Sequence, residues 1–138
     1  MRLLGLDMGS KRIGVAVSDE LGLFAQALTT IERESSAEDL DKIKTLVEER
    51  GIEKVVVGLP RRTDGRVGEE AERVLKFVER LQKKLKVPVT TWDEWFSTQA
   101  ATKTLLEADL PRAKRKKIVD KLAAVIILQG YLESKAGK

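Results

Sequence analysis

The apolar positions near the N-terminus form continuous runs rather than an alternating pattern. Residues 3–6 are such a run, Asp7 follows it, and a second apolar segment begins after the tight turn at residues 9–12. A continuous apolar run is typical of a strand that is buried on both faces. Residues 24–31 predict a third strand, and the short connections predict that the three strands form an antiparallel meander.

The middle of the chain alternates between helical and strand patterns. Residues 35–38 have the form of a capping box, apolar residues follow at helical spacing, and Gly51 supplies the helix end. Residues 52–58 then predict a buried strand. A long amphipathic helix is predicted over residues 69–85, with the following side chains facing inward: Val74, Phe77, Val78, Leu81 and Leu85.

The last third of the chain adds one strand and two helices. Residues 87–92 predict a strand, Ser97 predicts the N-cap of a helix ending at Leu106, and a final helix runs from near Pro111 to about Ser134. Strands that alternate with helices imply parallel neighbours, whereas the meander is antiparallel. The sequence therefore predicts an α/β fold with a mixed sheet and, from its 138 residues, a single domain over residues 1–138.

Composition narrows the chemistry that this chain can perform. It has no Cys and no His, which excludes Ser-His-Asp and Cys-His triads and argues against a zinc site. A site made only of carboxylates selects hard ions such as Mg or Mn. The formal net charge of +4 mildly favours a polyanionic partner. The longest apolar run, residues 122–128, is too short to span a bilayer, so we expect a cytoplasmic protein with no membrane partner.

Candidate metal-binding acids stand at the ends of two predicted strands. Asp7 ends the first strand, and the pair Asp93 and Glu94 follows residues 87–92. Ligands of α/β sheets sit at the carboxyl ends of the strands. Because successive strand side chains point to opposite faces, only one member of the pair enters such a site, and the pattern does not say which. For Asp7 the alternative is structural, with its side chain capping the turn that follows.

A third acid, Asp120, lies on the predicted last helix. It shares a helical stripe with small and apolar residues, namely Ala123, Ala124 and Ile127. A lone acid on a packing face needs a partner, and a salt bridge to a neighbouring helix explains it as well as a metal ion does. Two strand-end acids and one inward-facing helix acid, in a chain without His or Cys, favour a metal site.

Basic residues are clustered in short groups. The run at residues 112–117 places cations at the start of a helix, where the macrodipole disfavours them. Phosphate binding would offset this effect, although a solvated charged face without a ligand is the common alternative. Cations beside acidic metal ligands suit a nuclease. The candidate nucleic-acid-binding residues are Lys11, Arg12, Arg61, Arg62, Lys114, Arg115, Lys116 and Lys117.

Four motifs follow one another along nearly the whole chain: GLDMGSKRIGVAVSD, VVVGLP, the Asp93–Glu94 pair followed by Ser97 and Thr98, and KKIVDKLAAVIILQGYL. In this order they resemble the YqgF/RuvX family, the pre-16S rRNA nucleases that are also described as Holliday-junction resolvase-like. The resemblance implies a ribonuclease H-like fold. It also implies that Asp7, Glu94 and Asp120 are the catalytic acids and bind one or two Mg or Mn ions.

Two positions depart from the pattern of that family. Members commonly carry Arg where this chain has Trp95, and RuvC-type resolvases carry a fourth acid on the last helix where this chain has Ala123. The resemblance therefore carries over no arginine at position 95, and it gives weaker support to a second metal ion and to junction resolution.

The resemblance implies a nuclease that processes the 5′ end of pre-16S ribosomal RNA in ribosome biogenesis, with structured RNA as its partner. We expect a monomer or a weak homodimer. One alternative is a Holliday-junction resolvase that cuts branched DNA, which needs two active sites and hence a dimer. Another is a non-catalytic nucleic-acid-binding factor. A nucleotide-binding module is a fourth hypothesis, because residues 7–11 resemble the first phosphate loop of actin-like ATPases and sugar kinases, but the chain is too short for their second lobe.

Overall fold

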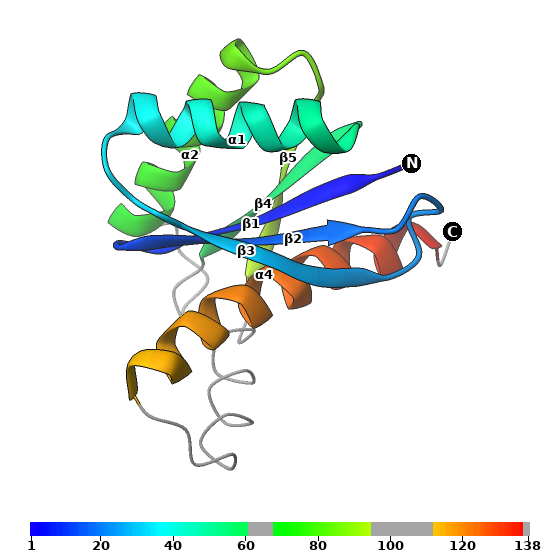
Figure 1. Ribbon diagram of the computed structural model, residues 1–138. Helices are drawn as coiled ribbons and strands as arrows, with labels where there is room; N and C mark the ends of the chain where they lie inside the picture. The colour runs from blue at the N-terminus through cyan, green and yellow to red at the C-terminus, as the bar shows by residue number, and fades with distance from the viewer. Residues whose placement is uncertain (61–67, 95–111, 137–138) are drawn as a thin grey trace.

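A computed structural model describes residues 1–60, 68–94 and 112–136, and for residues 94, 112–120 and 136 it describes the backbone alone (Figure 1). The helices and strands of these segments, in chain order, are β1 (Leu3–Met8), β2 (Arg12–Ser18), β3 (Ala25–Glu32), α1 (Ser36–Arg50), β4 (Lys54–Pro60), α2 (Glu69–Lys84), β5 (Val89–Glu94) and α4 (Arg112–Ala136).

The five described strands form one mixed sheet in the order β3-β2-β1-β4-β5. β1, β2 and β3 pair antiparallel, which confirms the predicted meander. β4 pairs parallel with β1 on one side and with β5 on the other. The carboxyl ends of β1, β4 and β5 therefore lie at the same edge of the sheet, and the predicted α/β fold with a mixed sheet is confirmed.

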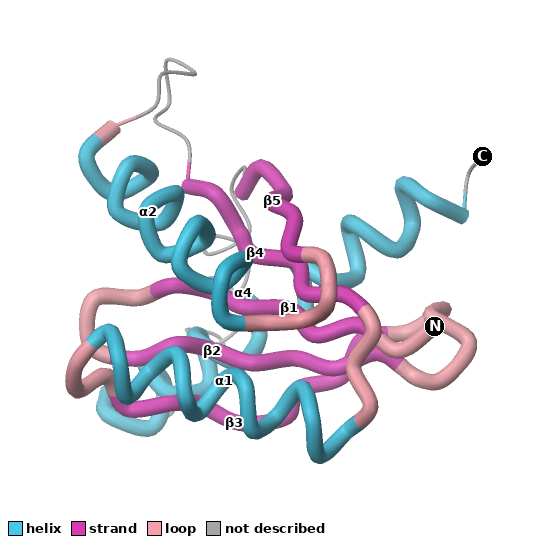
Figure 2. The backbone as a smooth tube through the Cα atoms, turned by 90° about the horizontal axis from the view of Figure 1, so that it is seen from above, coloured by secondary structure: helices cyan, strands magenta, loops and turns pink. Residues whose placement is uncertain are grey.

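Helices cover both faces of this sheet (Figures 1 and 2). α1 and α2 pack on one face, where Leu4 and Leu6 of β1 join their apolar side chains in the larger core. α4 packs on the other face, where Leu3 contributes to a smaller core that includes Leu128. β1 is thus buried on both faces, as its continuous apolar run predicts.

Local signals in the sequence account for the ends of α1. The Ser35 side chain accepts a hydrogen bond of 3.2 Å from the Glu38 amide, which is the predicted N-cap. Gly51 follows the helix in the left-handed region at φ 62°, a backbone conformation that residues other than glycine rarely adopt. The apolar face predicted for α2 is also confirmed, since its five inward-facing residues are all buried.

The predicted strand boundaries need correction at four places. β1 covers Leu3–Met8, so Asp7 does not end the first strand, because Met8 still pairs with Ile13 of β2. β4 covers Lys54–Pro60 rather than residues 52–58, because the Ile52 amide bonds the Val47 carbonyl and so closes the end of α1. β3 begins one residue later than predicted, after the exposed Phe24. β5 covers Val89–Glu94 rather than residues 87–92, because Pro88 has no amide to donate. The predicted helix from Ser97 to Leu106 lies outside the described residues.

None of the helices in the described part of the chain is long and apolar enough to cross a membrane.

Candidate active site

Asp7 is the fifth residue of β1 and lies near the carboxyl edge of the sheet. Its neighbours Leu6 and Met8 belong to the core under α1 and α2. Because strand side chains alternate, Asp7 is on the opposite face, which α4 covers. It is half-buried there. The sequence prediction of an acid at a strand end therefore corresponds to a partly exposed carboxylate at the sheet edge.

The turn after β1 is held by main-chain hydrogen bonds. The Gly9 amide donates to the Arg12 carbonyl at 2.9 Å and to the Asp7 carbonyl at 3.2 Å. A Cβ atom on Gly9 would lie 2.6 Å from the Arg12 carbonyl oxygen, so the turn requires glycine here. The tight turn fixes the backbone that directly follows Asp7 in the chain.

The register of β5 separates Asp93 from Glu94. Trp92 packs edge-on against Tyr131 of α4, with ring centroids 6.0 Å apart. By the two-residue period of a strand, position 94 falls on the α4 face with Trp92, and Asp93 falls on the opposite face. Through β4, the pairs Leu6↔Val57 and Val57↔Thr91 align β1 with β5, which places position 94 on the same face as Asp7. The side chain of Glu94 lies outside the described residues.

The backbone of α4 passes closely over β1. A Cβ atom on Gly5 would lie 2.7 Å from Leu128 Cβ and 3.2 Å from the Ala124 carbonyl oxygen, so only glycine allows this approach. The Ala25 amide, at the start of β3, donates to the Gln129 side chain of α4. Ala25 pairs with Ser18 at the end of β2, which lies at the amino end of β1, so α4 runs from the carboxyl end of β1 towards its amino end (Figure 1). Position 120 precedes Ala124 by about 6 Å of helix and so lies towards the Asp7 end.

Three acidic positions on three separate elements are therefore directed by the backbone to the same region. Asp7 is the second-last residue of β1, Glu94 is the last residue of β5, and Asp120 is on α4 one turn before the close contact with Gly5. Oxygen donors of this kind fit Mg or Mn. Among the side chains that the structure describes, no group of three acids is close enough to hold a metal ion, but those of Glu94 and Asp120 are outside that set.

The structure describes the side chains of two of the predicted nucleic-acid-binding residues, Lys11 and Arg12. Lys11 is exposed at the turn after β1. Arg12 forms an ion pair with Glu32 across the β2–β3 pair, with 2.9 Å between Nε and Oε1. Arg61 and Arg62 lie outside the described residues. The residues of the run at 114–117 are on the first turns of α4, and their side chains are outside the description.

An ion pair with a buried acid, beside the Asp7 turn, is not predicted from the sequence. The Asp39 side chain is only 2% exposed and lies 3.3 Å from Arg33 Nε, and it also accepts a hydrogen bond from the Glu34 amide at 3.2 Å. Arg33 in turn donates to the Gly9 carbonyl at 3.0 Å. The available signal was the four-residue spacing of Asp39 from Ile43, which puts this acid on the apolar face of α1.

Three exposed acids near α1 have shifted pKa values. A hydrogen bond between the carboxyl groups of Glu34 and Glu38 lowers the pKa of Glu34 and raises that of Glu38, and Lys42 lowers the former further. The Lys84 ammonium lowers the pKa of Asp41, first through a hydrogen bond and then through its charge. Lys84 Nζ lies 2.6 Å from Asp41 Oδ1 and so joins α2 to α1.

Known proteins match this chain over nearly all its length. The model of the RuvX family, described as a Holliday junction resolvase, matches residues 1–134. A protein from Clostridium novyi (strain NT), named "Putative pre-16S rRNA nuclease", is 54% identical over 134 residues, which are 97% of this chain and 99% of that protein.

Solved structures of resolvases share the fold. T. thermophilus RuvC in complex with a Holliday junction substrate has a TM-score of 0.62 at 17% identity, covering 100% of this chain and 97% of that one. The fowlpox virus resolvase in complex with Holliday junction DNA also has a TM-score of 0.62, at 10% identity and with 98% and 99% coverage. At these identities the two structures support the ribonuclease H-like fold alone. Because the family model and the C. novyi protein both match nearly the full chain, this chain belongs to the RuvX family.

Proposed function

We propose that this chain is a metal-dependent nuclease that hydrolyses phosphodiester bonds of structured nucleic acid, and that its substrate is the 5′ end of pre-16S ribosomal RNA. The observation that carries the proposal is the register of the sheet. It puts position 94 on the same face and edge as Asp7, next to the helix that carries Asp120. The name of the C. novyi protein, 54% identical over almost the full length, supports the substrate.

Each acid has a separate part in this proposal. Asp7, which lies on β1 in the middle of the sheet, supplies the central carboxylate. Glu94 completes the ligand set from β5, and Asp120 closes it from α4. One or two Mg or Mn ions, when bound, would activate a water molecule and stabilise the charge on the leaving oxygen. The tight turn at Gly9 holds Asp7 in place, because its main-chain bonds leave the strand end little freedom.

The proposal also covers the domain, its compartment and its contacts with nucleic acid. Residues 1–138 form a single nuclease domain that works in the cytoplasm, where it meets precursor RNA, as a monomer or a weak homodimer. The exposed Lys11, beside the Asp7 turn, contacts the nucleic-acid backbone. Arg12 contributes less directly, because Glu32 already neutralises its charge.

Junction resolution is the second candidate function. A specific observation favours it, since the family model that matches residues 1–134 is described as a Holliday junction resolvase. Symmetric cutting of a four-way junction requires two active sites, so this candidate predicts a dimer at working concentration.

The two candidates can be separated in one experiment. A 5′-labelled precursor of 16S rRNA and a labelled four-way DNA junction are incubated in parallel with the protein and Mn, with EDTA as the control. We expect cleavage of the RNA, products with 5′ phosphates, and no cleavage in EDTA. Cleavage of the junction alone would favour the resolvase, and binding of both without cleavage would favour a non-catalytic binding factor.

A further inference from the structure

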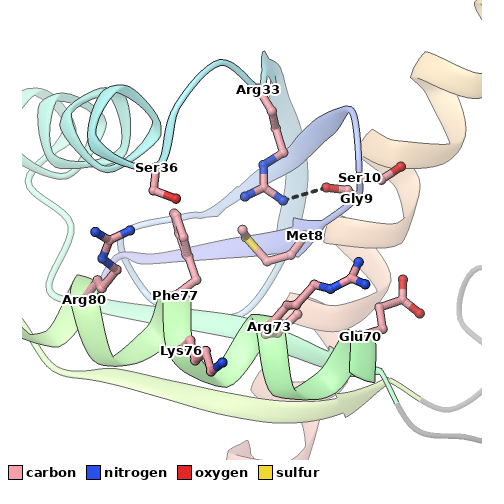
Figure 3. Close-up of a pocket in the computed structure, with 11 residues that line it drawn as sticks. Met8, Gly9, Ser10, Arg33, Ser36, Glu70, Arg73, Lys76, Phe77 and Arg80 are labelled. Carbon is pink, nitrogen blue, oxygen red and sulfur yellow. Dashed lines mark hydrogen bonds between the residues drawn. The ribbon is translucent and has the colours of Figure 1, made fainter. Parts of the chain in front are cut away.

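A pocket of about 350 Å³ lies on the sheet face opposite to the acidic positions. Figure 3 shows it between the turn after β1, the start of α1 and one flank of α2. Gly9 and Ser10, the second and third residues after Asp7, form one wall. Phe77, which is buried, forms part of the floor. The pocket therefore adjoins the turn behind the candidate active site and does not belong to it.

The lining of this pocket is strongly basic. Arg33, Arg73, Lys76 and Arg80 contribute four positive charges, and Glu70 contributes one negative charge. Arg33 is held in place by Asp39 and by the Gly9 carbonyl, with its guanidinium 5.8 Å from the centre of the Phe77 ring. The three cations of α2 recur at spacings of three and four residues, so they share one flank of the helix.

Within the described part of the chain, two of these four cations have no ion-pair partner. No acidic group there lies within ion-pair distance of Lys76 or Arg80. Arg73 reaches only the exposed Glu69, at 3.8 Å, a pair of the kind that contributes little. Like charges one turn apart on a helix destabilise it. An anion bound between them would offset that repulsion.

Phosphate is the anion that fits this set of donors best. Arginine side chains bind phosphate oxygens through paired hydrogen bonds. The pocket also meets the start of α1 at Ser36, and amide groups at the start of a helix favour negative charge. From Arg73 to Arg80 the flank extends about 10 Å along α2. Backbone phosphates of one strand of a duplex are about 3.4 Å apart along its axis, so the flank is long enough for more than one of them.

We propose that this pocket binds backbone phosphates of a nucleic-acid strand through Arg73, Lys76 and Arg80, on the far side of the β1 turn from the predicted metal site. This assignment rests on the proposed function, because it takes the strand to be the substrate. A strand that is cut near Asp7 passes Ser10 and continues along α2. The pocket then fixes the position of the substrate without contacting the bond that is cut.

The test compares two double variants with the same net charge. Arg73→Gln/Arg80→Gln removes two charges from the pocket. Lys44→Gln/Lys86→Gln removes two charges elsewhere, and among the described residues the one ion pair of Lys44 is a long 3.9 Å contact with Glu48. Arg33 is left unchanged, because its loss would also leave the buried Asp39 without its ion-pair partner. Binding of the precursor RNA is measured in EDTA at several salt concentrations, so the result does not depend on cleavage.

We expect the pocket variant to bind RNA about tenfold or more weakly, and its plot of log affinity against log salt to be shallower by about 1–2 units. In Mn, its KM should rise while kcat stays within about twofold of the wild-type value. Equal binding by wild type and pocket variant, or equal weakening in both double variants, would overturn the proposal. A wild-type protein that binds no nucleic acid would instead contradict the proposed function itself.

A small phosphate compound could occupy the pocket in place of the phosphates of a nucleic-acid strand. Thermal unfolding of the wild type and of both double variants is therefore followed with inorganic phosphate and with adenosine monophosphate. If either compound stabilises the wild type but not the pocket variant, while RNA affinity is unchanged, the pocket serves a small phosphate ligand and the assignment to a nucleic-acid strand is wrong. We expect RNA affinity to change in the pocket variant.

Discussion

The guanidinium of Arg33 donates a hydrogen bond of 3.0 Å from Nη1 to the main-chain oxygen of Gly9, two residues after Asp7. The Arg33 amide also donates to the Lys11 carbonyl at 2.9 Å. The segment between β3 and α1 therefore holds the turn after β1 at two points. The ion pair with Asp39 fixes the guanidinium of Arg33. The buried acid of α1 therefore supports the turn that follows Asp7.

Arg33→Met should lower the free energy of unfolding by about 2 kcal/mol. The change leaves the Asp39 carboxylate buried without its ion-pair partner, and such a loss is more damaging than the pair is stabilising. The loss is smaller than for a fully buried pair, because the Arg33 side chain is 28% exposed and water screens part of the interaction. Unfolding in urea measures the effect. Lys44→Met, which breaks an exposed pair, should change stability by less than about 0.5 kcal/mol, and equal losses would contradict the account.

Gly5→Ala should damage both stability and activity. The new Cβ atom would lie 2.7 Å from Leu128 Cβ, so α4 must move away from β1, at a cost of about 1–3 kcal/mol. That movement displaces Asp120 relative to Asp7, and we expect cleavage to fall by about tenfold or more. Urea unfolding and cleavage of labelled RNA are measured on the same preparation.

Gly51→Ala serves as the contrast for that variant. Gly51 has φ 62°, and apart from its chain neighbours no atom of the described residues lies within 4 Å of the position that an alanine methyl group would take. Alanine there meets backbone strain of about 1–2 kcal/mol but no collision. The variant should lose stability and keep its cleavage rate when fully folded. A similar fall in cleavage for both glycine variants would mean that the position of α4 is not what matters.

The ion pair between Lys84 and Asp41 should make stability depend on pH. The pKa of Asp41 is lower in the folded protein, so the contribution of the pair is complete above the pKa of the unfolded chain. It is lost as the pH falls through the folded value. Lys84→Met should raise the Asp41 pKa towards its ordinary range, which NMR titration of the side-chain carboxyl measures. Lys83→Met is the control, and an equal shift in both variants would contradict the assignment.

Much of the fold could be predicted because apolar runs and helix caps are local signals. The N-cap at Ser35, the end at Gly51 and the inward face of α2 were all predicted and are confirmed. The strand boundaries were shifted where hydrogen bonding, and not hydrophobicity, sets the limit. Pro88 is one example, because a residue that looks apolar and strand-like lacks the amide that the sheet needs.

The candidate site could be predicted only in part. The residue types and their places at strand ends pointed to Asp7 and to the Asp93–Glu94 pair. The resemblance implied Glu94, but a physical reason for that choice needs the register between β1, β4 and β5, which spacing along the chain cannot supply. The pair of Arg33 and Asp39 was missed for a similar reason. Its members are close in sequence, yet the partner that gives them a role, Gly9, belongs to a distant turn.

The register predicts different outcomes for two adjacent acids. Glu94→Gln should reduce cleavage by about 100-fold or more, because position 94 shares a sheet face with Asp7 and the neutral amide is a poorer metal ligand. Asp93→Asn should keep the rate within about threefold, since Asp93 falls on the opposite face. Both substitutions remove one negative charge, so a general electrostatic effect would reduce cleavage equally. If Asp93→Asn reduced cleavage more than Glu94→Gln, then Asp93, and not Glu94, would be the acid of the site.

Cleavage of the labelled 16S rRNA precursor by wild type and by Asp7→Asn, over a range of Mn concentrations, tests the central claim most directly. Circular dichroism and RNA affinity in EDTA first establish that the variant is folded and binds its substrate. We expect the wild type to cut in proportion to metal occupancy and Asp7→Asn to retain at most about 1% of that rate, as loss of a central metal ligand requires. Cleavage by Asp7→Asn at the wild-type rate would contradict the claim that these acids form the active site.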